Sequence, residues 1–275
     1  MSDLTVLKIG GSLLTDKTRD EGLRPHILDS LAEELRQCLD DGLLESIVIV
    51  HGVGSFGHPL VMRHGLHRGL VGHHQLLPMS IVQSRVNELR AALVRSLQDH
   101  GIPACLLHPS SMAVSDGGAI SRFFVEPLQG FLGMGMVPVL GGDMLVDTKT
   151  GISVCSGDQL AVLIARWMHA GRLIFACDVS GVYTADPKLD SQARLLPEID
   201  LSQLDRLPAP DESSDASGRM CGKLRSISTV ADLIREGLEV CLLSMLQRGN
   251  LRALLSGAQV ECTRIVSHPA QLLST

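Results

Sequence analysis

The sequence predicts an α/β protein, a three-layer α/β/α sandwich around a central, mainly parallel sheet. Short runs of Val, Ile and Leu, typical of strands buried on both faces, alternate with longer segments whose apolar residues recur at helical spacing. Glycine-rich turns follow several of these runs, as they do in parallel βαβ units. The 275 residues, of which 45% are hydrophobic and 20% charged, suffice to bury a large core.

The hydrophobic periodicity predicts the order of the elements along the chain. Strands are expected at residues 4–9, 46–50, 102–107, 137–140, 172–177, 238–243 and 261–266. Helices are expected at residues 26–41, 79–99, 123–134, 156–170, 218–236 and 251–255. Residues 144–155 predict a β-hairpin, with a Lys-Thr-Gly turn.

Composition and charge exclude several classes of protein. The net charge of −6 argues against binding to nucleic acid or to an acidic membrane, although a local basic site is compatible with it. The seven cysteines include no Cys-x-x-Cys pair, which argues against a disulfide framework or a zinc site and for a reducing compartment, the cytoplasm. We expect no signal peptide, because a basic N-terminal region is missing, and no membrane span.

The stretch His-Gly-Val-Gly-Ser-Phe-Gly-His-Pro at residues 51–59 directly follows a predicted strand. Its glycines let the backbone bend sharply and leave N–H groups unshielded, so that these groups can surround an anion. His58 stands at the far side, as a proton carrier and a partner for phosphate. The alternative interpretation is a glycine-rich turn with a surface histidine, because this glycine pattern alone is a weak signal.

Two lysines and an aspartate stand at other predicted turns. Lys8 is near the end of the first strand, where its ammonium group can join the N–H groups of the following turn; the alternative is a solvated lysine. Ser156 can cap a helix whose first turn holds Asp158, a position that favours a carboxylate with or without a functional role. Lys223 lies early in a later helix, where a cation is unfavourable unless an anion lies beside it.

Four predicted strands end in glycine-rich turns, at residues 10–11, 52–57, 141–143 and 178–181. In a mainly parallel sheet such ends share one edge, so the side chains beside them are expected to meet in one crevice. Those side chains are Lys8, Lys17, His58, Asp158 and Lys223. Cations and N–H donors organised by one carboxylate suit phosphoryl transfer, because that reaction depends mostly on positioning and charge neutralisation.

These motifs resemble the amino acid kinase superfamily over nearly the whole chain. The resemblance rests on residues 8–12, 52–57, 142–143, 156–158, 178–183 and 218–223. Residues 51–59, residues 12–17 (Ser-Leu-Leu-Thr-Asp-Lys) and residues 263–265 (Thr-Arg-Ile) are similar to the isopentenyl phosphate kinase family. Members of that family use ATP and magnesium to convert isopentenyl phosphate to the diphosphate.

The resemblance implies a role for each residue of the expected crevice. His58 would hold the acceptor phosphate, and Lys8 and Lys17 would bridge the transferring phosphates. Lys223 would hold the ATP tail, and Asp158 would orient the lysines. Acceptor contacts are implied for Gly52, Val53, Gly54, Gly57, His58 and Gly142. ATP contacts are implied for Lys8, Gly10, Gly11, Ser12, Asp178, Gly181, Val182, Tyr183, Asp186, Gly218 and Lys223.

The resemblance also implies one domain with an acceptor-binding lobe at residues 1–142 and a nucleotide-binding lobe at residues 143–275. The partners would be ATP and a small prenyl phosphate, Mg²⁺ would arrive on the ATP phosphates without protein ligands, and the chain would be a homodimer. Helix 81–97 is a candidate wall for the prenyl chain, although the same residues suit a helix core. Residues 63–74, rich in His and Arg, are interpreted as a mobile basic flap over a phosphate site and not as a metal site.

The sequence departs from the superfamily pattern at four positions. Val53 stands where glycine is usual, and Arg219 stands where glycine is common. Gly141 stands where histidine is usual, and Ser180 stands where aspartate is common. None of these departures removes an assigned cation, so the reaction class has more support than the substrate. Two alternatives stay open, a fosfomycin-type resistance kinase on the same scaffold and a non-catalytic nucleotide- or anion-binding member.

Overall fold

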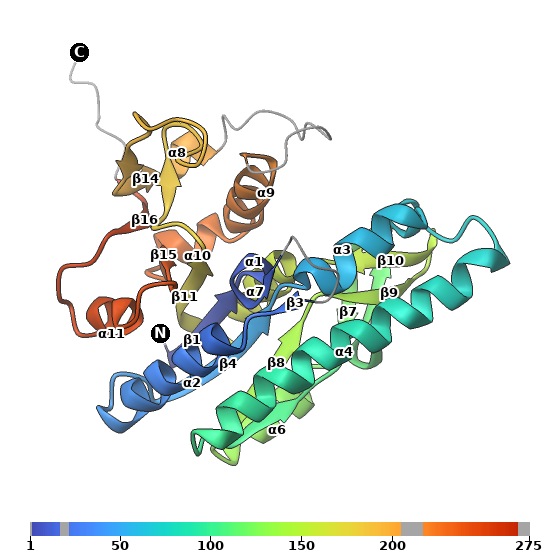
Figure 1. Cartoon of the computed structure of the whole chain (residues 1–275), viewed down its shortest axis with the longest axis horizontal. Coiled ribbons are helices and arrows are strands. Elements are labelled where there is room, and N and C mark those ends of the chain that lie inside the picture. The colour runs from blue at the N-terminus through green and yellow to red at the C-terminus, as the bar shows by residue number, and fades with distance from the viewer. Residues whose placement is uncertain (1, 17–21, 205–216, 269–275) are drawn as a thin grey trace.

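The computed structural model describes residues 2–16, 22–204 and 217–268 (Figure 1). Its centre is an eight-stranded sheet. In sheet order the strands are β14 Glu198–Asp200, β16 Cys262–Val266, β15 Glu239–Ser244, β11 Ala170–Cys177, β1 Ser2–Ile9, β4 Ser46–His51, β8 Val137–Gly141 and β5 Ala104–Leu106. The strands from β15 to β5 are parallel, whereas β16 is antiparallel to β15 and β14 is parallel to β16.

Helices cover both faces of this sheet, because successive side chains along each buried strand point to opposite faces. In β1, for example, Val6 packs in one apolar layer and Leu7 in the other. One layer contains α2 Pro25–Asp40, α4 Leu76–Asp99 and α11 Asn250–Leu255. The other contains α6 Glu126–Gly133, α7 Gly157–Trp167, α8 Leu201–Leu204, α9 Ser217–Ser228 and α10 Ala231–Arg235. The predicted three-layer sandwich is therefore confirmed.

A second, four-stranded sheet lies beside α4. In sheet order its strands are β10 Gly151–Cys155, β9 Asp143–Asp147, β6 Ala113–Asp116 and β7 Ala119–Phe123. The hairpin predicted at residues 144–155 is confirmed as the antiparallel pair β9–β10, whereas β6 and β7 were not predicted. A small apolar core that includes Val61, Val86 and Ile152 lies between this sheet, α4 and α3 Gly54–Arg63.

The remaining elements are short. They are α1 Gly11–Leu14, α5 Pro109–Met112, the 3₁₀ turns η1 Leu66–Arg68 and η2 His73–Gln75, and the strands β2 Thr15–Asp16, β3 Gly22–Leu23, β12 Val182–Tyr183 and β13 Leu195–Leu196. The four short strands form two antiparallel ribbons, β2–β3 and β12–β13.

Several predicted helices have wrong limits. The helix expected at residues 79–99 begins three residues earlier, at Leu76, and the helix expected at residues 156–170 ends at Trp167. The helix expected at residues 123–134 begins at Glu126, because Phe123 ends β7 and its ring stacks on Trp167 with 4.7 Å between the centroids. The helix expected at residues 218–236 is divided into α9 and α10. Both the N–H and the hydroxyl of Thr229 bond to the Ser226 carbonyl, which closes α9 with a tight turn.

The segment at residues 63–74 is anchored by Gln75. The buried Gln75 side chain accepts a hydrogen bond from the Val71 N–H at 2.6 Å and donates one to the His64 carbonyl at 3.2 Å. These bonds argue against the mobile flap that the sequence suggested. Within the described ranges, no group of three or more His, Cys, Asp or Glu side chains is arranged to hold a metal ion.

All seven cysteines are free thiols. In the described part of the chain, we find no helix that is both long and apolar enough to cross a membrane.

Candidate active site

The four strands that end in glycine-rich turns are neighbours in the sheet, in the order β11-β1-β4-β8, and all run parallel. Their carboxyl ends therefore meet at one edge, as the sequence predicts. The N-terminus of α7 lies at this edge too. If Gly157 carried a Cβ atom, that atom would lie 2.8 Å from the His51 carbonyl oxygen. N–H groups and side chains from five elements can thus reach one place.

The turns after β1 and β4 touch through their backbones. A Cβ on Gly11 would lie 2.4 Å from the Gly54 nitrogen, which is closer than real side chains approach. Gly54 has a φ of 51°, and a Cβ there would lie 2.1 Å from the Thr15 hydroxyl oxygen. Buried Thr15 fixes this contact, because its hydroxyl donates to the Gly11 carbonyl at 2.8 Å and accepts from the Ser55 N–H at 3.1 Å. Both glycines are therefore required for the two turns to meet.

Lys8, Asp158 and Lys223 form a buried ionic cluster at this edge. The Lys8 Nζ lies 2.8 Å from Asp158 Oδ1, and the Lys223 Nζ lies 2.9 Å from the same oxygen. The Lys223 Nζ also lies 4.8 Å from the centre of the Phe175 ring, a cation–π contact. The three charged residues come from β1, α7 and α9, so elements far apart in the sequence meet here, as predicted.

The start of α7 fixes Asp158 within this cluster. Ser156 is the N-cap, and its hydroxyl accepts a hydrogen bond from the Gln159 N–H at 3.0 Å, as the sequence predicts. Asp158 then lies in the first turn, where the N–H groups of the helix favour a negative charge.

The ionisation of the cluster follows from its burial and its charges. Burial alone would raise the pKa of Asp158, but the ammonium groups of Lys8 and Lys223 lower it below its ordinary value. Burial lowers the pKa of Lys8. Burial also acts to lower the pKa of Lys223, but Asp158, Cys177 and the hydrogen bond with Lys8 together raise it above its ordinary value. One carboxylate between two ammonium groups leaves a net positive charge where water is mostly excluded. An anion is attracted strongly to such a place, because the local dielectric constant is low.

The residues predicted to contact the acceptor lie on α3 and on the turns beside it. His58 is exposed and lies one turn beyond Gly54 on α3, the helix that starts at the same edge as Lys8. Val53 packs between two glycines: a Cβ on Gly57 would lie 2.8 Å from one Val53 methyl group, and a Cβ on Gly142 would lie 2.9 Å from the other. With a φ of −85°, Val53 fits the residue before α3 without backbone strain.

The residues predicted to contact the nucleotide follow β11, and several are engaged within the protein. The Asp178 carboxylate accepts a hydrogen bond from Ser12 and pairs with the Lys188 Nζ at 2.7 Å. Burial would raise the pKa of Asp178, but these partners lower it. Asp186 accepts a hydrogen bond from the Lys188 N–H at 2.9 Å, and Ser180 donates one to Glu261 at 3.2 Å. These contacts order the loop after β11.

Thr263 holds the next part of that loop. Its hydroxyl accepts a hydrogen bond from the Val182 N–H at 2.8 Å and donates one to the Leu196 carbonyl at 2.6 Å. A Cβ on Gly181 would lie 2.3 Å from this hydroxyl oxygen, which explains the glycine. The Val182 side chain is only 8% exposed and packs in the main core, and the ATP contact expected of this residue stays a prediction. Tyr183, the next residue, is half-buried.

Two predicted site residues are less fully placed. Lys17 lies outside the described residues. Gly218 lies in the first turn of α9, the helix that also carries Lys223.

Gly10 and Gly52 tie the turns after β1 and β4 to neighbouring strands. The Gly10 N–H donates to the Ala176 carbonyl at 2.9 Å, and the Gly52 N–H donates to the Ile9 carbonyl at 2.8 Å.

The sequence assigned no role to four buried polar residues that hold this edge together: Thr15, His51, Arg90 and Thr263. Three of them stand in motifs that carry the family resemblance, and Arg90 stands in none. The sequence does not show what the hydroxyl groups of the two threonines bind, because their partners are remote in the sequence or belong to the backbone. Arg90 does leave a local signal. It lies on the apolar face of the helix predicted at residues 79–99, in line with Val86 and Leu93, where a charged side chain calls for a partner.

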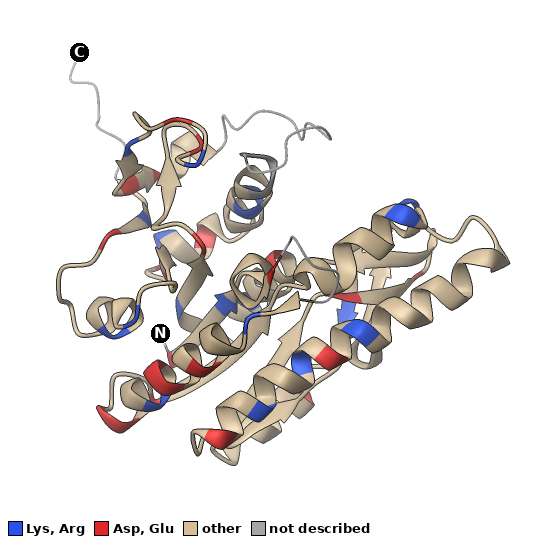
Figure 2. Ribbon diagram, in the orientation of Figure 1, with Lys and Arg blue, Asp and Glu red and all other residues tan. Residues whose placement is uncertain are grey.

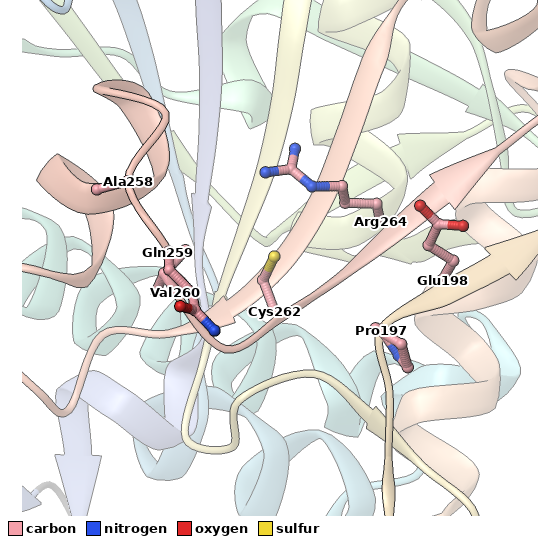
Figure 3. A pocket seen from close by; sticks show the side chains of 7 residues that line it. All are labelled: Pro197, Glu198, Ala258, Gln259, Val260, Cys262 and Arg264. Atoms are coloured by element: carbon pink, nitrogen blue, oxygen red, sulfur yellow. The ribbon is translucent and has the colours of Figure 1, made fainter.

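A pocket of about 360 Å³ lies elsewhere, between β14, β16 and the segment that leads into β16 (Figure 3). Its lining includes Glu198, Cys262 and Arg264 but none of the residues predicted for the site. Cys262 belongs to the apolar layer that contains α2 and α11, whereas Lys8 faces α7. Arg264, part of the Thr-Arg-Ile motif, therefore lies away from the ionic cluster.

Fold and cluster together define a class of protein, the α/β proteins that hold phosphate groups at the carboxyl edge of a mainly parallel sheet. The chain belongs to the amino acid kinase family, whose model matches residues 3–242. Within this family it belongs with the isopentenyl phosphate kinases. It is 33% identical over 270 residues to the isopentenyl phosphate kinase of Methanothermobacter thermautotrophicus, across 95% of this chain and 98% of that protein.

Two other comparisons agree with this placement. The chain is 28% identical over 236 residues to the isopentenyl phosphate kinase of Thermoplasma acidophilum, across 86% of this chain and 90% of that protein. Its structure superposes with a TM-score of 0.82 and 31% identity on an X-ray structure of isopentenyl phosphate kinase, covering 96% of this chain and all of that one.

Proposed function

We propose that this chain transfers the γ-phosphoryl group of ATP to the phosphate of a small prenyl monophosphate, with isopentenyl phosphate as the first candidate. The observation that carries the proposal is the buried cluster of Lys8, Asp158 and Lys223, whose net positive charge lies where the strand ends meet. The activity for which the relatives are named supports the same acceptor.

In this reaction the acceptor needs no general base, because a phosphate monoester oxygen is already anionic at pH 7. That oxygen attacks the γ-phosphorus of ATP in line. The new P–O bond forms as the bond to the β-phosphate oxygen breaks, and the products are ADP and a diphosphate. Lys8 and Lys17 are assigned to the transferring group and Lys223 to the ATP tail. Asp158 keeps the ammonium groups of Lys8 and Lys223 in place, so catalysis consists of positioning and charge neutralisation.

We assign Mg²⁺ to the ATP substrate and not to a protein cage. The carboxylate in the cluster, Asp158, is already paired with two ammonium groups and is a poor further ligand. Among the residues that the structure describes, no group of His, Cys, Asp and Glu side chains offers an alternative. Magnesium held mostly by phosphate oxygens and water is common in enzymes that bind ATP.

We assign the two substrates, the acceptor and the nucleotide, to the two halves of the chain. Residues 1–142 are proposed to bind the acceptor and residues 143–275 the nucleotide, except that β9–β10 joins the acceptor side because β9 pairs with β6. The apolar core between α3, α4 and these strands, which includes Val82 and Met144, is the proposed wall for the prenyl chain.

We further propose that the chain forms a homodimer in the cytoplasm, as the family resemblance implies. Light scattering of the purified protein tests the dimeric state.

The experiment that tests this function is an ATP-consumption assay with magnesium and a panel of small acceptors. The panel contains isopentenyl phosphate, dimethylallyl phosphate, longer prenyl phosphates, fosfomycin and a nonprenyl alkyl phosphate. We expect turnover with a prenyl phosphate and formation of its diphosphate. Turnover with fosfomycin alone supports the resistance-kinase alternative, and binding of ATP without turnover on any acceptor supports the non-catalytic one.

Replacement of the exposed α3 histidine tests the acceptor side of the site. We expect His58→Ala to lose most of its turnover, roughly 100-fold or more, because one charge-stabilising contact to the acceptor phosphate is gone. ATP binding, measured by calorimetry, should remain within about twofold. The control is His64→Ala, which removes an exposed histidine from the C-terminal end of the same helix. Near-normal kinetics of His58→Ala would contradict the assigned role.

A further inference from the structure

A buried polar network lies beneath the acceptor side of the candidate site, and Arg90 on α4 is its centre. The Arg90 side chain is fully buried. Its Nε lies 3.1 Å from His51 Nε2, and its Nη1 lies 2.9 Å from Asn87 Oδ1 and 2.7 Å from His108 Nδ1. Among the residues that the structure describes, the Nη2 finds no hydrogen-bond partner. It lies 4.0 Å from Asp143 Oδ2, which balances the charge of the guanidinium group.

The contacts of Arg90 reach three neighbouring strand ends. His51 is the last residue of β4, Asp143 follows β8 after one residue, and His108 lies just beyond β5. Asp143 is fixed in turn, because its carboxylate accepts hydrogen bonds from the Ser110 N–H at 3.1 Å and the Met144 N–H at 2.8 Å. One buried guanidinium group therefore links the ends of β4, β5 and β8.

The contact with Arg90 decides which nitrogen of His51 carries the proton. An arginine Nε–H can only donate, so His51 Nε2 is the acceptor and the proton is on Nδ1. His51 Nδ1 lies 3.2 Å from the Gly52 carbonyl oxygen and donates to it. Burial, together with the positive charge of Arg90, lowers the pKa of His51 to about 3, so the ring is neutral and keeps this one tautomer.

These hydrogen bonds fix the direction of the peptide bond between Gly52 and Val53. The Gly52 N–H donates to the Ile9 carbonyl at 2.8 Å, and the Gly52 carbonyl accepts from His51. In a trans peptide the C=O and the following N–H point in opposite directions. The His51 ring lies on the α4 side, so the Val53 N–H points away from it. Within the described part of the chain, that N–H donates to no other group.

Gly141 makes room for this arrangement. A Cβ at this position would lie 2.2 Å from the His51 ring, so any side chain there would displace the imidazole. The glycine and the buried His51–Arg90 pair therefore form a connected feature of this chain.

We propose that Arg90 is a positioning residue that acts through His51 to aim the Val53 N–H at the acceptor phosphate. The proposal rests on the proposed function, because it assumes that the acceptor phosphate lies at the turn after β4. Arg90 touches no substrate. It selects the tautomer of His51, and His51 sets the orientation of the amide that binds the phosphate.

The test compares variants of both residues with isopentenyl phosphate as the acceptor. His51→Leu removes both hydrogen bonds of the ring, whereas His51→Asn keeps a donor near the position of Nδ1 and loses only the link to Arg90. We expect the acceptor KM of His51→Leu to rise about tenfold or more, with the ATP KM unchanged within about twofold, and His51→Asn to recover part of the loss. Arg90→Lys keeps the charge beside Asp143 and should raise the acceptor KM in the same direction.

A double variant separates positioning from a merely structural role. If Arg90 acts through His51, adding Arg90→Lys to His51→Leu should raise the acceptor KM little further, so the two effects should not add. The matched control is Glu34→Gln, which alters a buried charged residue on α2 that accepts a hydrogen bond from the Arg252 N–H. We expect this control to lower stability without a change in the acceptor KM.

Three outcomes overturn the proposal. One is an unchanged acceptor KM in the folded His51→Leu protein, and another is an equal rise of the ATP KM and the acceptor KM. The third is full additivity of the two substitutions, which would mean that Arg90 acts independently of His51. If the wild-type protein phosphorylates none of the acceptors, the proposed function fails, and this proposal fails with it. If the wild-type protein turns over and the variants keep its acceptor KM, the proposed function stands and only the positioning role of Arg90 fails.

Discussion

At the scale of single residues, the site depends on one carboxylate held between two ammonium groups. The sequence suggested that Lys8, Asp158 and Lys223 converge, because each stands beside a strand end or a helix start. Their common oxygen contact at Asp158 Oδ1 could not be derived, since it depends on how α7 and α9 pack. The roles of Thr15 and Thr263 could not be predicted for the same reason, because each acts through partners that the folded chain brings near. Arg90 left a signal, a charge on the apolar face of a predicted helix, but its partners could not be derived.

Replacement of Asp158 tests both the ionic cluster and its dependence on pH. In Asp158→Asn the two lysines lose their shared counter-ion, so we expect turnover to fall by about 100-fold or more and the free energy of unfolding at pH 7 to fall by about 3 kcal/mol. The folded-state pKa of Asp158 is below its unfolded value of about 3.9, so the stabilisation is complete above that pH and is lost as the pH falls further.

Denaturant titrations of wild type and Asp158→Asn at pH 7, 5 and 3.5 measure this dependence. The difference in unfolding free energy should be the same at the two higher pH values and smaller at the lowest. The control is Asp232→Asn, whose carboxylate pairs with Arg166 at the surface and should contribute little to stability. A difference that stays constant down to pH 3.5 would show that Asp158 is not the ionised partner of the lysines.

At the scale of elements, hydrophobic periodicity predicted the central strands and the long helices, because apolar runs and helical spacing are local properties. It missed β6 and β7, which alternate buried and exposed residues only weakly and are held by tertiary contacts. Asp147, for example, accepts hydrogen bonds from the Gly117 and Gly118 N–H groups, 30 and 29 residues away. The break between α9 and α10 was also missed, because the apolar spacing continues through Thr229 and Val230 while the hydrogen bonds do not.

The Thr263 hydroxyl on strand β16 holds the loop after β11 through two hydrogen bonds. We expect Thr263→Val to raise the ATP KM about fivefold or more and to leave the acceptor KM unchanged, because the Val182 N–H and the Leu196 carbonyl both lose their partner. Steady-state kinetics with each substrate varied in turn measures both constants. The control is Thr148→Val, which removes a hydroxyl that bonds to Asp116 at the surface of the second sheet. Equal changes in the two KM values would contradict a role limited to the nucleotide side.

At the scale of the whole molecule, the two halves of the chain share one sheet. Strands β1, β4, β8 and β5 come from residues 1–142, and the other four come from residues 143–275. The halves join where β1 pairs with β11, next to the ionic cluster. The net negative charge lies partly on α2, whose acidic residues are visible in Figure 2. Because α2 ends just before β4 begins, Asp40 and Asp41 lie at the opposite edge of the sheet from the cluster, so the chain can be acidic and still attract phosphate.

The shared sheet predicts that the halves unfold together. Trp167, the single tryptophan, lies on α7 in the second half and stacks on Phe123 of β7 in the first, so its fluorescence reports the contact between them. We expect denaturation curves from this fluorescence and from far-UV circular dichroism to coincide, because separation of the halves would break the β1–β11 pairing and expose both core layers. ATP with magnesium at 100 times its Kd should shift the whole transition by about 2.7 kcal/mol. Two separate transitions, or an ATP shift of only one of them, would mean that the halves are independent domains and that the cluster is not held by a continuous sheet.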